Sequence, residues 1–236
     1  MRPRFSIPSG AIGQNGGMLR MRVPARKVTW ALLLAGMLIG GALVEADAPT
    51  VVSFDRVRPG TLPPGFRVLS SNEQESGRWQ VTRQDGRAVL SQLEVGGAGY
   101  RLAVLESPKV DHLRAGVRLR MAAGDRAAGL AWRVTDAHNY YAARLDLDSR
   151  EFILYKFVRG NRVRLSRVTD LRLKDDRWHE LAVEHVRDSI KVWLNGIPVA
   201  SERDEALPGA GMIGVWLPGD SSAHFTGLWF DPVRVP

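Results

Sequence analysis

A strict two-residue alternation over residues 113–121 constrains the fold of this chain more than any other feature. Apolar side chains occupy every second position and arginine occupies three of the positions between them: Leu113, Ala115, Val117, Leu119 and Met121 against Arg114, Arg118 and Arg120. Successive side chains of a β-strand point to opposite faces, so this pattern predicts a strand with one buried face. A helix would instead need apolar residues three and four positions apart.

The same pattern recurs between turn signals along the rest of the chain. Asp85-Gly86 and Asn195-Gly196 are dipeptides typical of tight hairpins. Two further inward-facing sets are predicted: Tyr141, Ala143, Leu145 and Leu147, and then Ile190, Val192 and Leu194. Beyond residue 46 we find no helical periodicity of useful length. Many short strands separated by turns predict an all-β, two-sheet antiparallel jelly-roll sandwich.

The amino-terminal segment has the composition of an export signal. Arg22, Arg26 and Lys27 precede an uncharged run of 17 residues, Val28–Val44, and the small residues Ala46 and Ala48 follow. We therefore expect residues 1–46 to be a leader with a signal peptide and residues 47–236 to be one periplasmic or secreted domain. The alternative is an uncleaved membrane anchor, in which case the chain contacts the membrane only through this segment.

The net charge of +8 reflects this leader more than the domain. Six of the 33 basic residues lie in residues 1–46, and the remainder of the chain holds 27 basic and 24 acidic residues. A nucleic-acid partner is therefore not expected. The absence of cysteine rules out disulfides, a lipidated cysteine anchor, thiol catalysis and cysteine-based metal sites.

The histidines do not form a recognisable metal motif. There are five of them, and none makes a ligand pair at helical spacing: His112, His138, His179, His185 and His224. His179-Glu180 begins like a zinc-protease motif, but Val183 stands where the second histidine is needed. We expect no cofactor, with calcium bound by loop carboxylates such as Asp136 or Asp148 as the one open possibility.

The second half of the chain resembles a known superfamily. The resemblance rests on Tyr140-Tyr141, Trp178-His179-Glu180-Leu181, Val192-Trp193-Leu194-Asn195-Gly196 and Gly211-Met212-Ile213-Gly214. In order and spacing these are similar to the concanavalin A-like lectin/glucanase superfamily, and within it to the laminin G-like and keto-disaccharide-hydrolase-like (domain of unknown function 1080) branch, over about residues 50–236. The resemblance implies a sugar-binding groove and a carbohydrate partner.

Three functions follow from the resemblance, because its members bind sugars, cleave glycosides or mediate adhesion. Carbohydrate recognition is the first, a glycoside hydrolase is the alternative, and a protein-binding adhesion module is the third. For a hydrolase, the resemblance to glucanases with a Glu-x-Asp-x-x-Glu strand points to Asp146, Asp148 and Glu151. However, Ser149-Arg150 predicts a turn that would carry Glu151 out of the groove, so a solvated hairpin tip is favoured.

Outward-facing aromatic and basic residues are the better candidates for binding. Trp193 and Tyr140 alternate with core positions, and aromatic rings stack on pyranose faces while arginine hydrogen-bonds hydroxyl groups. We expect one groove on a concave sheet, lined by Arg133, Tyr140, Arg144, Lys156 and Trp193. The alternative is that these side chains cover a second small core. Five other tryptophans are expected to anchor the core: Trp79, Trp132, Trp178, Trp216 and Trp229.

Overall fold

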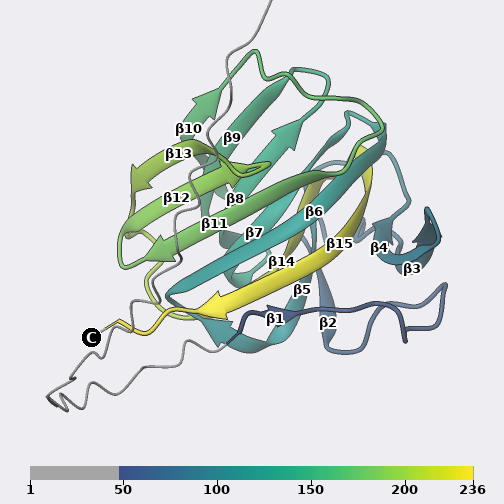
Figure 1. The fold of residues 1–236 in the computed structure, drawn as a ribbon, viewed down its shortest axis with the longest axis horizontal. Helices are drawn as coiled ribbons and strands as arrows, with labels where there is room; N and C mark the ends of the chain where they lie inside the picture. The colour runs from purple at the N-terminus through teal and green to yellow at the C-terminus, as the bar shows by residue number, and fades with distance from the viewer. Residues whose placement is uncertain (1–47, 236) are drawn as a thin grey trace, which may run out of the picture. The chain divides into compact units, whose positions relative to one another are not determined.

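The computed structural model describes residues 48–235, which form two antiparallel β-sheets packed face to face (Figure 1). The predicted all-β sandwich is confirmed. The signal peptide or anchor expected in residues 1–46 lies outside the described residues. Within 48–235, no helix is long and apolar enough to cross a membrane.

The first layer is an eight-stranded sheet. Its order is β13 (Ile197–Arg203), β12 (Ser189–Leu194), β11 (His179–Val186), β6 (Leu113–Gly124), β15 (Ser221–Pro232), β4 (Arg87–Gln92) and β3 (Trp79–Gln84). The short strand β1 (Thr50–Val51) pairs with β15, so the beginning and the end of the described chain lie side by side in one sheet.

The second layer is a seven-stranded sheet. Its order is β10 (Asn161–Val168), β9 (Glu151–Val158), β8 (Asn139–Asp146), β7 (Ala127–Asp136), β14 (Gly211–Pro218), β5 (Tyr100–Val110) and β2 (Phe66–Ser70). Strand β14 comes late in the chain but sits between β7 and β5, so it joins segments that are far apart in the sequence.

The main core fills the space between the sheets, and the alternation predicts which side chains enter it. Leu113, Val117 and Met121 of β6 are buried there, whereas Arg114 and Arg118 point outward. Tyr141, Ala143 and Leu145 of β8 enter the same core from the other sheet. The faces predicted for β6, β8 and β12 are therefore confirmed.

The outer face of the seven-stranded sheet carries a second buried apolar cluster. Tyr140, Phe157 and Trp216 are its largest fully buried members, and the small residues Ala131 and Ala142 lie among them. Tyr140 and Phe157 stack with ring centroids 4.3 Å apart. Large rings lying over small neighbours leave little of this face open to water, so the outer face is apolar where the alternation alone predicts a solvated one.

Three of the five tryptophans assigned to the core do not lie between the sheets. Trp79 and Trp132 are buried in the main core as expected. Trp216 is buried in the outer cluster of the seven-stranded sheet. Trp178 and Trp229 are only partly buried. Trp229 is the register partner of Gly116 on the outer side of the eight-stranded sheet, and the ring centroid of Trp178 lies 5.0 Å from the guanidinium carbon of Arg120.

Candidate functional site

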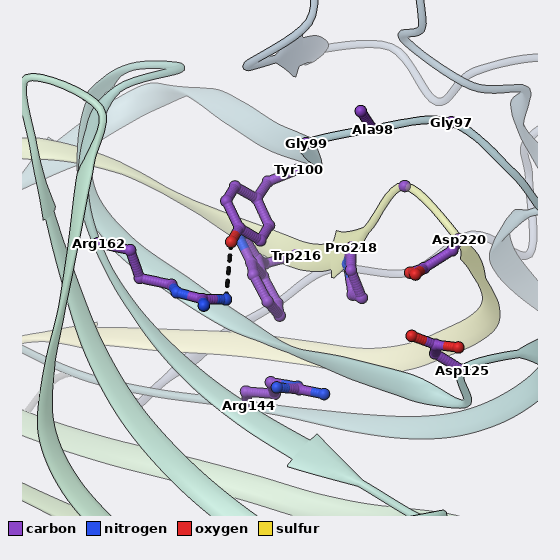
Figure 2. Close-up of a pocket in the computed structure, with 11 residues that line it drawn as sticks. Gly97, Ala98, Gly99, Tyr100, Asp125, Arg144, Arg162, Trp216, Pro218 and Asp220 are labelled. Atoms are coloured by element: carbon purple, nitrogen blue, oxygen red, sulfur yellow. Dashed lines mark hydrogen bonds between the residues drawn. The ribbon is translucent and has the colours of Figure 1, made fainter.

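A pocket of about 310 Å³ lies at one end of the outer face of the seven-stranded sheet (Figure 2). The floor and one wall come from the starts or ends of strands β5, β14, β8 and β10. The remaining wall comes from two turns and the loop before β5. The residues used below are Tyr100, Trp216, Arg144, Arg162, Asp125 and Asp220. Because they come from separate segments, the sheet order is what assembles the pocket.

The apolar wall of the pocket is a stacked pair of aromatic rings. Tyr100 is half-buried and lies on Trp216, with ring centroids 5.2 Å apart and an interplanar angle of 23°. Trp216 Nε1 donates a hydrogen bond to the hydroxyl of Tyr140 at 3.2 Å. Burial raises the pKa of Tyr140, so this phenol stays neutral. Trp216 is fully buried and supports Tyr100 from below, so the partly exposed Tyr100 is the ring that faces the pocket.

Two guanidinium groups form the basic wall. Arg162 of β10 donates a 2.7 Å hydrogen bond to the Tyr100 hydroxyl, drawn as the dashed line in Figure 2. Its Cζ also lies 5.1 Å from the ring centroid of Tyr155. Arg144 of β8 is ion-paired with Asp146, while its Nε atom is buried without a hydrogen-bond partner.

Two carboxyl groups line the wall of the pocket that lies opposite Arg162. Asp125 lies in the turn between β6 and β7, and Asp220 lies in the turn between β14 and β15 (Figure 2). Interaction with the neighbouring carboxyl group of Asp220 raises the pKa of Asp125. The oxygens of both groups can accept hydrogen bonds from the hydroxyl groups of a ligand.

The three carboxylates considered for catalysis are placed by the β8–β9 hairpin. Asp146 and Glu151 are direct register partners on the outer face, so the expectation that Glu151 leaves this face is wrong. The turn forms as predicted, but it returns the chain and brings Glu151 beside Asp146. Each is buried and ion-paired, Asp146 with Arg144 and Glu151 with Arg167 at 2.6 Å.

Asp148 stands apart from this pair. It is exposed and ion-paired with Arg126. The other aspartate considered for calcium, Asp136, accepts hydrogen bonds from the backbone of His138 at 2.7 Å and from Asn139 Nδ2 at 3.0 Å. Among residues 48–235, no group of three histidine or acidic side chains is placed to hold a metal ion. Asp136 and Asp148 thus have protein partners of their own.

The five predicted ligand-binding residues do not share one groove. Only Tyr140 and Arg144 lie on the outer face of the seven-stranded sheet. Lys156 pairs in register with Tyr141, so it faces the sandwich interior, where it is ion-paired with Asp204. Trp193 belongs to β12 of the other sheet. The single groove is corrected because alternation specifies the face of a strand and not the sheet to which it belongs.

Arg133 forms hydrogen bonds to the loops at the far end of β7. Its guanidinium is buried and donates to three backbone carbonyls, those of Asp111 at 2.8 Å, Arg187 at 3.1 Å and Leu207 at 3.3 Å. Its backbone φ of 48° marks the irregularity in the β7–β8 pairing. All three contacts join loops of the protein to one another, and Arg133 does not line the pocket shown in Figure 2.

Of the six pocket residues used above, four escaped the sequence analysis: Tyr100, Asp125, Arg162 and Asp220. Two local signals were available. Gly97-Ala98-Gly99 before Tyr100 and Pro218-Gly219-Asp220 are turn sequences, and turns gather where strands end. What the sequence lacks is any indication that these two turns meet, as they do through the 2.9 Å hydrogen bond from Gly219 N to Gly99 O.

Several solved structures share the fold of this chain. No family model matches the chain. No curated protein matches it either. Among solved structures, a carbohydrate-binding module, CBM66 from Bacillus subtilis, is 18% identical, with 71% of this chain and 95% of that one covered and a TM-score of 0.58. A β-glucanase from Bacillus licheniformis is 12% identical, with coverage of 80% and 100% and a TM-score of 0.54.

A third structure is a Bacillus subtilis protein of unknown function with a galectin-like fold. It is 13% identical, with 80% of this chain and 100% of that one covered and a TM-score of 0.53. At these identities the likeness concerns the fold alone. The fold is that of the concanavalin A-like lectins and glucanases, as the resemblance implied. The finer assignment to the laminin G-like and keto-disaccharide-hydrolase-like branch is not confirmed by these matches.

Proposed function

We propose that this protein is an exported carbohydrate-binding domain whose sugar site is the pocket between Tyr100 and the Asp125–Asp220 pair. The observation that carries the proposal is the combination in one pocket of a stacked aromatic surface, two guanidinium groups and two carboxyl groups. The solved structures that share the fold include a carbohydrate-binding module and a β-glucanase, which supports a sugar ligand.

The chemistry of the pocket suits a sugar ring. A pyranose has an apolar face, which would stack on Tyr100, and a rim of hydroxyl groups, which would hydrogen-bond to its neighbours. Arg144 and Arg162 supply donors, and Asp125 and Asp220 supply acceptor oxygens. A few convergent polar groups around an apolar surface are what fixes the orientation of a small ligand.

The arrangement favours binding over hydrolysis. A glycosidase needs two carboxyl groups about 5–9.5 Å apart on either side of the scissile bond, with one kept neutral as the acid. The turns that carry Asp125 and Asp220 are joined by a backbone hydrogen bond from Asp125 N to Asp220 O at 3.2 Å, so the two carboxyl groups lie side by side on one wall of the pocket and not on either side of a bound sugar chain. Asp146 and Glu151 are each neutralised by an arginine. We therefore place glycoside hydrolysis second and protein adhesion third.

The direct test is glycan binding by the full chain, first on a glycan array and then by calorimetry with the best oligosaccharide. Tyr100→Ala removes the stacking surface and is expected to weaken binding roughly tenfold or more. Arg162→Ala removes the donor that orients Tyr100 and is expected to act in the same direction.

Arg164→Ala is the matched control for Arg162→Ala. Arg164 lies two residues further along β10, is exposed, and does not line the pocket. Its loss should leave the affinity unchanged. Undiminished binding by both Tyr100→Ala and Arg162→Ala would rule out this pocket as the sugar site, and an array on which the wild-type chain binds nothing would argue against the function itself.

A further inference from the structure

An apolar row crosses the outer face of the eight-stranded sheet, on the opposite side of the sandwich from the pocket. Direct register partners on six neighbouring strands make up this tryptophan row: Val51, Trp229, Gly116, Ala182, Trp193 and Pro198, on β1, β15, β6, β11, β12 and β13. Partners in register share a face, so the six positions form one continuous line perpendicular to the strands.

Polar rows flank the tryptophan row on both sides. On one side, Asp231, Arg114, Glu184 and Lys191 are partners in register. Arg114 Nε lies 2.9 Å from Glu184 Oε2, and Lys191 Nζ lies 3.5 Å from Glu184 Oε1. On the other side, the row runs through Thr226, Arg118 and Glu180. Each flanking row contains both positive and negative side chains, so the tryptophan row between them has no strong net electrostatic potential.

The middle of the row is flat because its residues are small. A Cβ atom on Gly116 would lie 2.5 Å from Nε1 of Trp229 and 2.7 Å from Cε2, so the indole rests directly against the backbone of β6. Ala182 continues this low floor as far as Trp193. Both tryptophans are partly exposed, and Val51 at the end of the row is 64% exposed. The two partly exposed indoles and the small residues between them form a flat surface and not a closed pocket.

We propose that the tryptophan row is a second carbohydrate surface, which binds a neutral polysaccharide chain lying across the strands. Three strand spacings separate Trp193 from Trp229, or about 14 Å between backbones, a distance that about three linked hexose units would span. Each indole stacks on a sugar ring, and the mixed charged rows on either side offer donors and acceptors to the hydroxyl groups.

The size and charge of the row favour a sugar chain over a protein partner. Six strands by one residue row amount to roughly 24 Å by 7 Å, or under about 200 Å². A stable protein interface buries about 800 Å² on each partner. The balanced flanks give no reason to prefer an acidic or a basic ligand. This surface is independent of the pocket, because the two lie on different sheets.

The test is retention of the full chain by three probe polymers: microcrystalline cellulose, chitin, and a soluble mixed-linkage β-glucan cast in a native gel. The wild-type chain should be retained by at least one of them. Trp193→Ala and Trp229→Ala should each reduce that retention about fivefold or more, whereas Trp229→Phe, which keeps a flat ring, should retain most of it.

Ile197→Ala is the matched control, because Ile197 is 66% exposed beside the same hairpin but lies outside the row. Its retention should equal that of the wild type. If Trp229→Ala is misfolded by circular dichroism, Trp193→Ala alone decides the outcome. The proposal is overturned if none of the three polymers retains the wild-type chain, or if every folded tryptophan-to-alanine variant is retained as strongly as the wild type.

The same panel separates this proposal from the pocket. Arg162→Ala should lose oligosaccharide binding and keep polymer retention, and Trp193→Ala should do the reverse. Loss of both properties in Arg162→Ala would mean that one site serves both ligands, which would overturn the second surface.

Discussion

Arg133 shows how a single side chain can secure several loops. Its buried guanidinium donates hydrogen bonds to the carbonyl groups of Asp111, Arg187 and Leu207, which belong to three different connections between strands. Hydrogen bonds from a charged donor contribute more than neutral ones, and buried carbonyls left without a donor are costly. A residue that resembled a ligand contact in the sequence is therefore expected to be a determinant of stability.

Arg133→Ala should lower the free energy of unfolding by about 3 kcal/mol, since three buried acceptors lose their donor at once. Urea denaturation at neutral pH measures this directly. Arg164→Ala, which removes an exposed arginine from β10, should change the same quantity by less than about 0.5 kcal/mol. A loss below about 1 kcal/mol for Arg133→Ala would mean that water replaces the guanidinium.

His185 makes the stability of the domain depend on pH. It is fully buried, and its Nδ1 accepts a 3.0 Å hydrogen bond from Trp132 Nε1. Burial, helped by the positive charge of Arg133, lowers the pKa of His185 to about 3. Between about pH 6.5 and 3 the unfolded chain thus binds a proton that the folded chain does not, so acid destabilises the fold in this range.

The free energy of unfolding should fall by up to about 1.4 kcal/mol for each pH unit below 6.5 on account of this one histidine. His185→Gln keeps an acceptor for Trp132 and does not titrate. Between pH 6.5 and 5 the free energy of unfolding of this variant should therefore fall less steeply with decreasing pH than that of the wild type, by the equivalent of about one proton. Burial also lowers the pKa of His224, so part of the slope will remain. Equal slopes in both proteins would show that His185 is protonated in the folded state.

At the scale of elements, the β12–β13 hairpin shows a turn whose sequence and geometry agree. Asn195 and Gly196 have φ values of 50° and 79°, the left-handed pair that a tight two-residue hairpin requires. Asn195 Oδ1 also accepts the backbone N–H of Glu180 at 2.9 Å, which ties the turn to the start of β11. The turn therefore sets the register of the strand that carries Trp193.

Gly196→Ala should destabilise the domain by about 1 kcal/mol, because an alanine at this φ is strained although nothing lies within 4 Å of the added methyl group. Thermal unfolding should show a lower Tm. Ile197→Ala, at the neighbouring exposed position, is the control and should leave Tm nearly unchanged. An unchanged Tm in Gly196→Ala would indicate that the turn relaxes to another type.

The same elements show how far alternation can predict structure. It correctly assigned the inward faces of β6, β8 and β12, since burial of one face follows from the two-residue period. It could not tell that Tyr140 and Trp193, which have equivalent patterns, belong to different sheets. Nor could it show that the β8–β9 turn returns Glu151 to the side of Asp146, because pairing register is a property of two strands together.

At the scale of the whole molecule, the candidate site depends on sheet order, which is a long-range property. Tyr100, Asp125, Arg162 and Trp216 converge only because β14 inserts between β5 and β7. No local pattern in the sequence encodes that insertion. The fold class was predictable because the alternation within each strand shows which of its faces is buried. The pocket was not predictable, because its residues come together only through the order of the strands in the sheet, which no single strand encodes.

The pairing of β1 with β15 has a mechanical consequence. Thr50 lies opposite Phe230, so the first strand of the described chain is the antiparallel neighbour of the end of its last strand (Figure 1). Tension applied between Thr50 and the end of β15 would load the two register pairs between β1 and β15 one after the other, so β1 would separate from β15 before the longer strand pairings of the sandwich were loaded.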